Sequence, residues 1–204
     1  MAITAQQVND LRQRTGAGLM ECKGALAESG GDLEKAVDIL RKKGRAKADK
    51  LADREAKAGR VGAYVHFNGK VAAMVELTSE TDFVANTDDF QNLLRDIALH
   101  ISFAKPTVVK REQLSPELIE REKAIFEDQV KGKPAEMAEK ILQGKLEKGL
   151  FMQHVLLDQE FCNQEKFKGT ISEMLKAVVG KIRENITVRR FAWFEIGTGA
   201  AASL

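Results

Sequence analysis

Apolar residues in positions 1–44 recur at helical spacing in three short runs that are separated by glycines. This periodicity predicts three amphipathic helices that share a small core. The first helix begins after Thr4, whose spacing from Gln7 is that of a capping box, and the third begins after Asp32, a favourable N-cap residue. We expect the third helix to end at Gly44, because glycine commonly terminates helices. The pattern therefore predicts a three-helix domain over residues 1–44.

Residues 45–59 contain almost no large apolar side chains and carry charges of both signs in alternation. Such a segment has little to bury, so it does not form a core of its own. We interpret it as a solvated helical linker between the three-helix domain and the rest of the chain.

The following region shows the alternation of a β-hairpin and then the periodicity of a helix. The alternating apolar residues lie on both sides of Asn68-Gly69: Val61, Ala63, Val65 and Phe67 before it, and Val71, Ala73, Val75 and Leu77 after it. Asn-Gly between two such runs favours a tight hairpin turn, since both residues accept positive φ. Helical spacing then runs from Phe90 to Ile101, and Pro106 stops it. An antiparallel sheet packed on helices, and thus an α+β fold for residues 60–204, is predicted.

A charged, helix-rich insertion is expected at about residues 113–150. Ser115-Pro116 provides an N-cap followed by proline at the first helical position. Gly132-Lys133-Pro134 then divides the pattern into two halves, each with a narrow apolar seam. These features predict an antiparallel helical hairpin, or short coiled coil, that projects from the body.

The C-terminal part combines a helix with a strand that is apolar on both faces. Thr170 and Glu173 have capping-box spacing before the helix. In the strand over residues 186–196, simple alternation gives one face with Ile186, Val188, Arg190, Ala192, Phe194 and Ile196, and another with Thr187, Arg189, Phe191, Trp193 and Glu195. Because one layer of a small protein covers only one face, the other indicates a subunit contact. Residues 197–204 are expected to form a frayed tail.

Charge and cysteine content disfavour several classes of protein. The chain has 32 basic and 30 acidic residues, and a net charge of +2 is too balanced for a nucleic-acid footprint. No apolar run is long enough to cross a bilayer, and the N-terminus lacks the pattern of a signal peptide. Cys22 and Cys162 do not form a CxxC pair, so neither a disulfide nor a zinc site is indicated. We expect a cytoplasmic protein.

Catalytic chemistry is also disfavoured. The three histidines, His66, His100 and His154, do not have metal-ligand spacing, and Cys22 has no evident base beside it. No enzyme activity, cofactor or metal ion is therefore expected. Binding of RNA through the linker would require a basic excess that the segment does not have.

The most informative short segment is Thr81-Asp82-Phe83-Val84, between the hairpin and the following helix. It places a large ring beside a carboxylate in a connector, where binding residues are often found. One interpretation is that Phe83 folds back as a core residue, since aromatic side chains are mostly buried. The other is that Phe83 is a wedge that enters a groove in a partner. Leu19 and Met20, which follow the turn Thr15-Gly16-Ala17-Gly18, leave the same choice between core and partner contact.

Taken together, the motifs resemble one family, bacterial and organellar elongation factor Ts, the nucleotide exchange factor of elongation factor Tu. The matching segments are Leu11-Arg12-x-x-Thr15-Gly16-Ala17-Gly18-x-Met20-x-Cys22-Lys23, Glu80-Thr81-Asp82-Phe83-Val84, Phe90-Gln91, Ile97-Ala98-x-His100-Ile101, Lys105-Pro106, Gly132-Lys133-Pro134 and Ala138-Glu139-Lys140-Ile141. They follow in order along nearly the whole chain.

The resemblance implies a function and a set of site residues. Residues 1–44 would be a ubiquitin-associated-type (UBA-like) domain that docks on the nucleotide-binding domain of Tu. The docking residues would be Arg12, Leu19, Met20 and, on the core helix, His100, although the family often has Met where Leu19 stands. Phe83 of Thr81–Val84 would insert between two helices of Tu, and Asp82 would help to reposition them, which disturbs the Mg²⁺ site and phosphate loop of Tu and releases GDP.

One departure from the family's longer members concerns assembly. Those members have two copies of the sheet-and-helix core, whereas this chain has material for one. The short form is implied to pair as a homodimer through its sheets. A plain adaptor, which binds a partner through the three-helix domain without affecting nucleotide, is the alternative function.

Overall fold

The computed structural model describes residues 3–131, 134–198 and 201–203, and it has the α+β architecture predicted from the sequence. Four strands in this part of the chain form one antiparallel sheet in the order β1-β2-β3-β4: Ala58–Val65, Val71–Ser79, Ile186–Glu195 and Ala201–Ser203. The α-helices are α1 (Ala5–Thr15), α2 (Leu19–Glu28), α3 (Leu33–Leu51), α4 (Asp82–Ala85), α5 (Asp88–Ala104), α6 (Pro116–Asp128), α7 (Ala135–Leu146), α8 (Met152–His154) and α9 (Ile171–Ile182). A π-helical turn, Glu147–Phe151, connects α7 to α8, and short 3₁₀ turns lie at Arg111–Gln113 and Leu156–Asp158.

Helices α1, α2 and the first part of α3 form the expected three-helix unit. The capping box is confirmed, because the Gln7 amide donates to Thr4 Oγ1 at 3.2 Å and the Thr4 amide donates to Gln7 Oε1 at 3.0 Å. Asp32 caps α3 by accepting from the Lys35 amide at 3.1 Å. The unit has its own small core of Val8, Leu11, Cys22, Ala25, Leu26 and Ala36.

The expectation that the third helix ends at Gly44 is wrong. Helix α3 passes through Gly44 and ends at Leu51, because Gly44 lies where α3 crosses α9. A Cβ atom on Gly180 of α9 would lie 2.8 Å from the Gly44 carbonyl oxygen and 2.9 Å from its Cα. Real Cβ atoms do not lie this close to other heavy atoms. The backbones of α3 and α9 therefore approach each other so closely at Gly44 and Gly180 that there is no space for a side chain on Gly180.

The interpretation of residues 45–59 as a solvated linker is also wrong for its first half. Ala48 is buried in the main core, beside residues of α9 and the sheet. Arg41 and Arg45 both pair with Glu173, the capping-box residue of α9. The second half of α3 therefore packs on the body and joins the two parts firmly. The division into residues 1–44, 45–59 and 60–204 stays a prediction.

The predicted hairpin is confirmed as β1 and β2, and Gly69 has positive φ (66°), whereas Asn68 does not: among the described non-glycine residues only Lys105 and Arg183 have it. The inner face of the sheet packs on α5, where a Cβ on Gly62 would lie 2.6 Å from Leu94 Cγ. The alternating apolar residues of β1 instead lie on the outer face, where Val61 and Val65 are exposed. Helix α5 ends at Ala104, before Pro106, as predicted.

The two faces of β3 do not follow simple alternation. A β-bulge shifts the register opposite Glu76 and Leu77 of β2. Because a bulge inserts one extra residue, the inward-facing positions shift from even-numbered to odd-numbered residues at Arg189-Arg190. The buried residues are therefore Ile186, Val188, Phe191 and Trp193, whereas Phe194 and Ile196 are exposed. Glu76 pairs with both Arg189 (2.9 Å) and Arg190 (2.7 Å) at the bulge.

The C-terminal tail is not wholly frayed, because Ala201–Ser203 forms β4 at the edge of the sheet, next to β3. Backbone pairing to an open strand edge stabilises a segment that has no strong sequence pattern.

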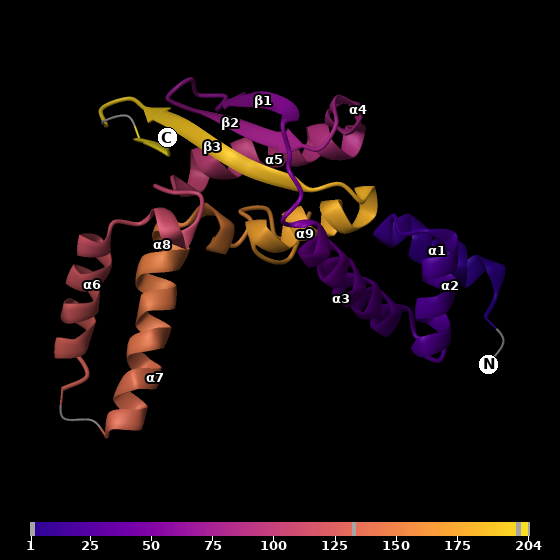
Figure 1. The fold of residues 1–204 in the computed structure, drawn as a ribbon, viewed down its shortest axis with the longest axis horizontal. Helices are drawn as coiled ribbons and strands as arrows, with labels where there is room; N and C mark the ends of the chain where they lie inside the picture. Colours follow the sequence, from indigo (N-terminus) through magenta and orange to yellow (C-terminus); the bar gives the residue numbers. More distant parts are fainter. Residues whose placement is uncertain (1–2, 132–133, 199–200, 204) are drawn as a thin grey trace.

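Helices α6 and α7 form the predicted projecting hairpin, at the opposite end of the molecule from α1 and α2 (Figure 1). Ser115 caps α6 as expected, accepting from the Leu118 amide at 3.1 Å. In the predicted break, Gly132 and Lys133 lie outside the described residues, and Pro134 directly precedes α7. Among the described residues, no helix combines the length and apolar character that a bilayer crossing requires.

Candidate partner-binding surface

Thr81–Val84 is not an irregular loop. Thr81 is the N-cap of the one-turn helix α4, and its Oγ1 accepts from the Val84 amide at 3.4 Å. Threonine favours this position because its hydroxyl replaces a missing helical hydrogen bond. The segment thus has a fixed backbone, in which each side chain takes a defined direction.

Phe83 points into solvent with 81% of its surface exposed, whereas the next residue, Val84, is 5% exposed and belongs to the main core. Successive residues of a helix point about 100° apart, so burial of Val84 turns Phe83 outward. The interpretation of Phe83 as a core residue is therefore wrong. Asp82 is exposed beside the ring.

Hydrogen bonds from neighbouring segments fix the N-cap residue Thr81 and the start of α4. The Thr81 amide donates to Glu184 Oε2 at 3.0 Å, and Thr81 Oγ1 donates to Glu184 Oε1 at 2.8 Å. The Ser79 hydroxyl donates to the Thr81 carbonyl at 2.9 Å, and Asn86 Nδ2 donates to the Asp82 carbonyl at 2.8 Å. The backbone that carries the exposed ring therefore has little conformational entropy to lose on binding.

The second candidate element is the start of α2. Gly16 ends α1 in the left-handed region, with φ of 65°, and the chain then turns into α2. Cys22 belongs to the small core, whereas Leu19 (53% exposed) and Met20 (74% exposed) point into solvent. Arg12 is exposed on α1. The core interpretation of Leu19 and Met20 is wrong; their role in docking stays a prediction.

Figure 1 places α4 and the three-helix unit toward the same end of the molecule. The end of α9 connects them: Arg183 pairs with Glu21 of α2 at 3.0 Å, and the neighbouring Glu184 binds Thr81. The two exposed apolar elements, Leu19-Met20 and Phe83, are therefore held by consecutive residues of one turn.

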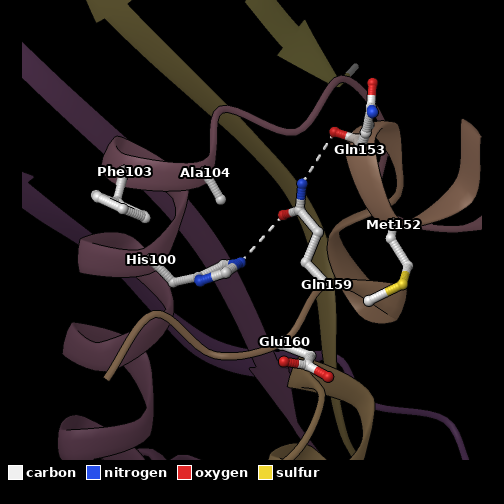
Figure 2. Close-up of a pocket in the computed structure, with 7 residues that line it drawn as sticks. All are labelled: His100, Phe103, Ala104, Met152, Gln153, Gln159 and Glu160. Atoms are coloured by element: carbon white, nitrogen blue, oxygen red, sulfur yellow. Dashed lines mark hydrogen bonds between the residues drawn. The ribbon is translucent and has the colours of Figure 1, made fainter. Parts of the chain in front are cut away.

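His100 lies elsewhere and does not face solvent. It is 1% exposed, at the base of a cavity of about 310 Å³ lined also by Phe103, Met152 and Gln159. The Cys162 amide donates to Nδ1 at 3.2 Å, so Nε2 carries the proton and lies 3.0 Å from Gln159 Oε1. Gln159 in turn donates to the Gln153 carbonyl at 3.0 Å (Figure 2).

These contacts satisfy both ring nitrogens, and burial lowers the pKa of His100 to about 4. A ring with no free polar atom and almost no exposed surface does not offer a docking contact. The expectation that His100 itself contacts a partner is therefore wrong in this structure. The residue orders the segment around Cys162 and Gln159.

Sequence reasoning did not find Glu184 or Arg183. Both lie beyond the end of an amphipathic helix, where charged residues usually carry no signal. Their partners, Thr81 and Glu21, are distant in the sequence, so only the folded chain brings them together.

Comparisons with known proteins agree with this architecture. Residues 41–168 match the family model described as "Elongation factor TS". Elongation factor Ts of Fervidobacterium nodosum is 51% identical over 199 residues, which cover 97% of this chain and all of that protein. The chain belongs to the elongation factor Ts family. The factor Ts of Citrifermentans bemidjiense is 50% identical over 98% of this chain and 93% of its own, and that of Thermodesulfovibrio yellowstonii is 50% identical over 97% and 98%.

Membership of the elongation factor Ts family makes the chain a protein of translation elongation. The family match confirms the resemblance drawn from the motifs. It includes the whole of α4 and α5, and hence the exposed Phe83.

Proposed function

We propose that this elongation factor Ts is a guanine nucleotide exchange factor that binds elongation factor Tu and releases its GDP. The observation that carries the proposal is the exposed Phe83 ring on the fixed backbone of α4. Exchange requires no acid, base or nucleophile of this chain, because it changes only the affinity of Tu for nucleotide.

In the proposed mechanism, Leu19 and Met20 bind a helical surface of Tu while Phe83 enters a groove between two of its helices. Asp82 moves with the ring and repositions the same helices. The shift disturbs the Mg²⁺ site and phosphate loop of Tu. Because Mg²⁺ is a large local charge that bridges phosphate oxygens to protein, its displacement weakens GDP binding.

Linkage fixes what the ring can contribute. If this protein binds nucleotide-free Tu more tightly than GDP-bound Tu, the difference in binding free energy is subtracted from the free energy with which Tu binds GDP. Burial of one Phe side chain contributes roughly 1.5–3 kcal/mol. At about 1.4 kcal/mol per factor of ten, the ring alone changes the nucleotide affinity by roughly ten- to a hundredfold. Larger effects require the docking contacts as well.

The test is release of a fluorescent GDP analogue from Tu. Phe83→Ala is expected to slow the maximal release rate roughly ten- to a hundredfold, while binding to Tu stays measurable. Phe103→Ala is the matched control, since Phe103 is a similarly exposed ring on α5 (74%) outside α4. Wild-type release by Phe83→Ala would refute the wedge. Binding without any acceleration by the unmodified protein would favour the adaptor alternative.

We also propose that two copies pair through the outer face of the sheet. This face carries a row of exposed apolar side chains that continues across three strands: Val61 and Val65 of β1, Met74 of β2, and Phe194 of β3, followed by Ile196 directly after that strand. A contiguous exposed apolar surface of this kind is typical of an interface.

Sedimentation of the purified chain tests the pairing. Met74→Glu places a charge in the middle of the apolar row and is expected to convert a dimer to a monomer. Ile125→Glu adds the same charge on α6, where Ile125 is also exposed, and is expected to leave the dimer intact. A monomeric unmodified chain would refute the pairing and leave the exchange mechanism untouched.

A further inference from the structure

The end of α9 and the turn that joins it to β3 contact α2, α5 and the N-cap of α4. Arg183 ends α9 in the left-handed region, with φ of 68°. On one side of it, Lys181 pairs with Asp89 of α5 at 2.7 Å. On the other, the Asn185 amide donates to Glu80 Oε1 at 2.7 Å, so the turn binds residues on both sides of α4.

Glu184 makes the direct contact with α4. Its two carboxylate oxygens accept separately from the Thr81 amide (3.0 Å) and the Thr81 hydroxyl (2.8 Å). The same hydroxyl accepts from the Val84 amide, which closes the turn that contains Phe83. A carboxylate with two acceptors fixes both the position and the rotation of the N-cap, because charge-assisted hydrogen bonds are short and directional.

Arg183 connects the same turn to the three-helix unit. Its guanidinium lies 3.0 Å from the carboxylate of Glu21. In the sequence, Glu21 directly follows Met20 and is two residues from Leu19. Glu21 also pairs with Lys47 of α3 at 2.5 Å, and hydrogen bonds from Lys47 and Arg183 hold the pKa of Glu21 below its ordinary value. Consecutive residues thus set the position of Phe83 relative to Leu19 and Met20.

We propose that Glu184 is a positioning residue for nucleotide exchange, which holds α4 so that the Phe83 ring enters the partner when the three-helix unit docks. The inference rests on the proposed exchange function. A ring that must fit a groove contributes only when it is already oriented, since each rotation left free reduces the gain on binding. Glu184 does not touch the partner; it acts through Thr81 and Phe83.

The predicted effect is on rate rather than on docking. Glu184→Ala removes both acceptors and is expected to lower the maximal rate of GDP release about three- to tenfold, the factor that one partly exposed charge-assisted contact supplies. The half-saturating concentration should change less than about twofold, because Leu19 and Met20 are intact. Glu184→Gln keeps one oxygen acceptor and should recover part of the rate.

The experiment measures release of a fluorescent GDP analogue from Tu against the concentration of each variant. Lys176→Gln is the control, since it removes a charged contact of the neighbouring helix α9, the ion pair with Asp49, and leaves α4 untouched. The decisive variant combines Glu184→Ala with Phe83→Ala. It should be no slower than Phe83→Ala alone, because a residue that acts through Phe83 has no effect once the ring is absent.

Two results would overturn the inference: a wild-type maximal rate for Glu184→Ala, or a loss that adds in full to that of Phe83→Ala. If the alanine variant does not fold, the close-to-isosteric Glu184→Gln replaces it in the experiment. The maximal rate of GDP release with Glu184→Gln should lie between that of the unmodified protein and that of Phe83→Ala. A wild-type maximal rate for this variant would refute the positioning role of Glu184. A wild-type rate for Phe83→Ala would instead refute the wedge on which the inference rests, and no acceleration of GDP release by the unmodified protein would refute the proposed function itself.

Discussion

The crossing of α3 and α9 makes a sharp prediction from two glycines. Gly44 and Gly180 both lie inside helices, where replacement by alanine normally stabilises by about 1 kcal/mol. A Cβ on Gly44 would have no atom within 4 Å, so Gly44→Ala is expected to raise the free energy of unfolding by about 1 kcal/mol. For a chain of this size the melting temperature should rise by about 2–4 °C.

Gly180→Ala should have the opposite sign. Its Cβ would lie 2.8 Å from the Gly44 carbonyl oxygen, whereas carbon atoms prefer contacts of about 3.5–4.0 Å, so the two helices must separate by up to about 1 Å. Overpacking of this kind costs about 1–3 kcal/mol, which offsets or exceeds the gain in helix propensity. Because backbone atoms are involved, no change of rotamer relieves the contact.

The assay is thermal unfolding followed by circular dichroism, with the GDP-release assay on the same samples. Gly180→Ala is expected to melt several degrees below Gly44→Ala, by about 2–4 °C per kcal/mol of difference. It should also raise the half-saturating concentration for Tu, since α3 carries the three-helix unit on α9. Equal melting temperatures for the two variants would refute the argument that the helices meet at these glycines.

Two further predictions concern buried and shared polar contacts. Burial holds the pKa of His100 at about 4, below its ordinary 6.5, so the unfolded chain binds a proton that the folded chain does not between these pH values. The contribution of His100 to the free energy of unfolding is therefore fully present above pH 6.5 and should fall by about 3 kcal/mol as the pH drops to 4. Chemical denaturation across this pH range should show a smaller loss of stability for His100→Gln. An equal loss in both proteins would contradict the assignment of this pH dependence to His100. Arg111 donates to both carboxylate oxygens of Glu147 (2.9 and 2.7 Å) and to Asp158 (2.6 Å), which raises the pKa of its guanidinium. Arg111→Lys cannot reproduce this forked contact and should lower the free energy of unfolding by about 1 kcal/mol after solvent screening. Amide hydrogen exchange in the variant should become faster at the base of the α6–α7 hairpin and stay unchanged in α1. An equal increase in exchange in both regions would refute a local role for Arg111.

The sequence by itself determined the local elements. Capping residues such as Thr4, Asp32 and Ser115 act through their own neighbouring amides, so their spacing predicts where helices begin. The hairpin around Asn68-Gly69 is equally local, because its turn depends on the φ angles of adjacent residues. The family motifs identified the fold and the role in translation elongation for the same reason, since they are continuous in the chain.

The tertiary structure decided what depends on distant partners. Gly44 continues a helix because Gly180 approaches it, and β3 changes face at Arg189-Arg190 because a bulge is set by the partner strand. Residue type alone did not determine whether Phe83 and His100 are buried. The structure decides between the two interpretations of Phe83, whose ring is exposed because Val84 fills the core, and it overturns the expectation of a partner contact for His100, which is buried and bound to Gln159. Burial and register are properties of how elements pack against one another, and a periodic pattern carries only the preferences of one element at a time.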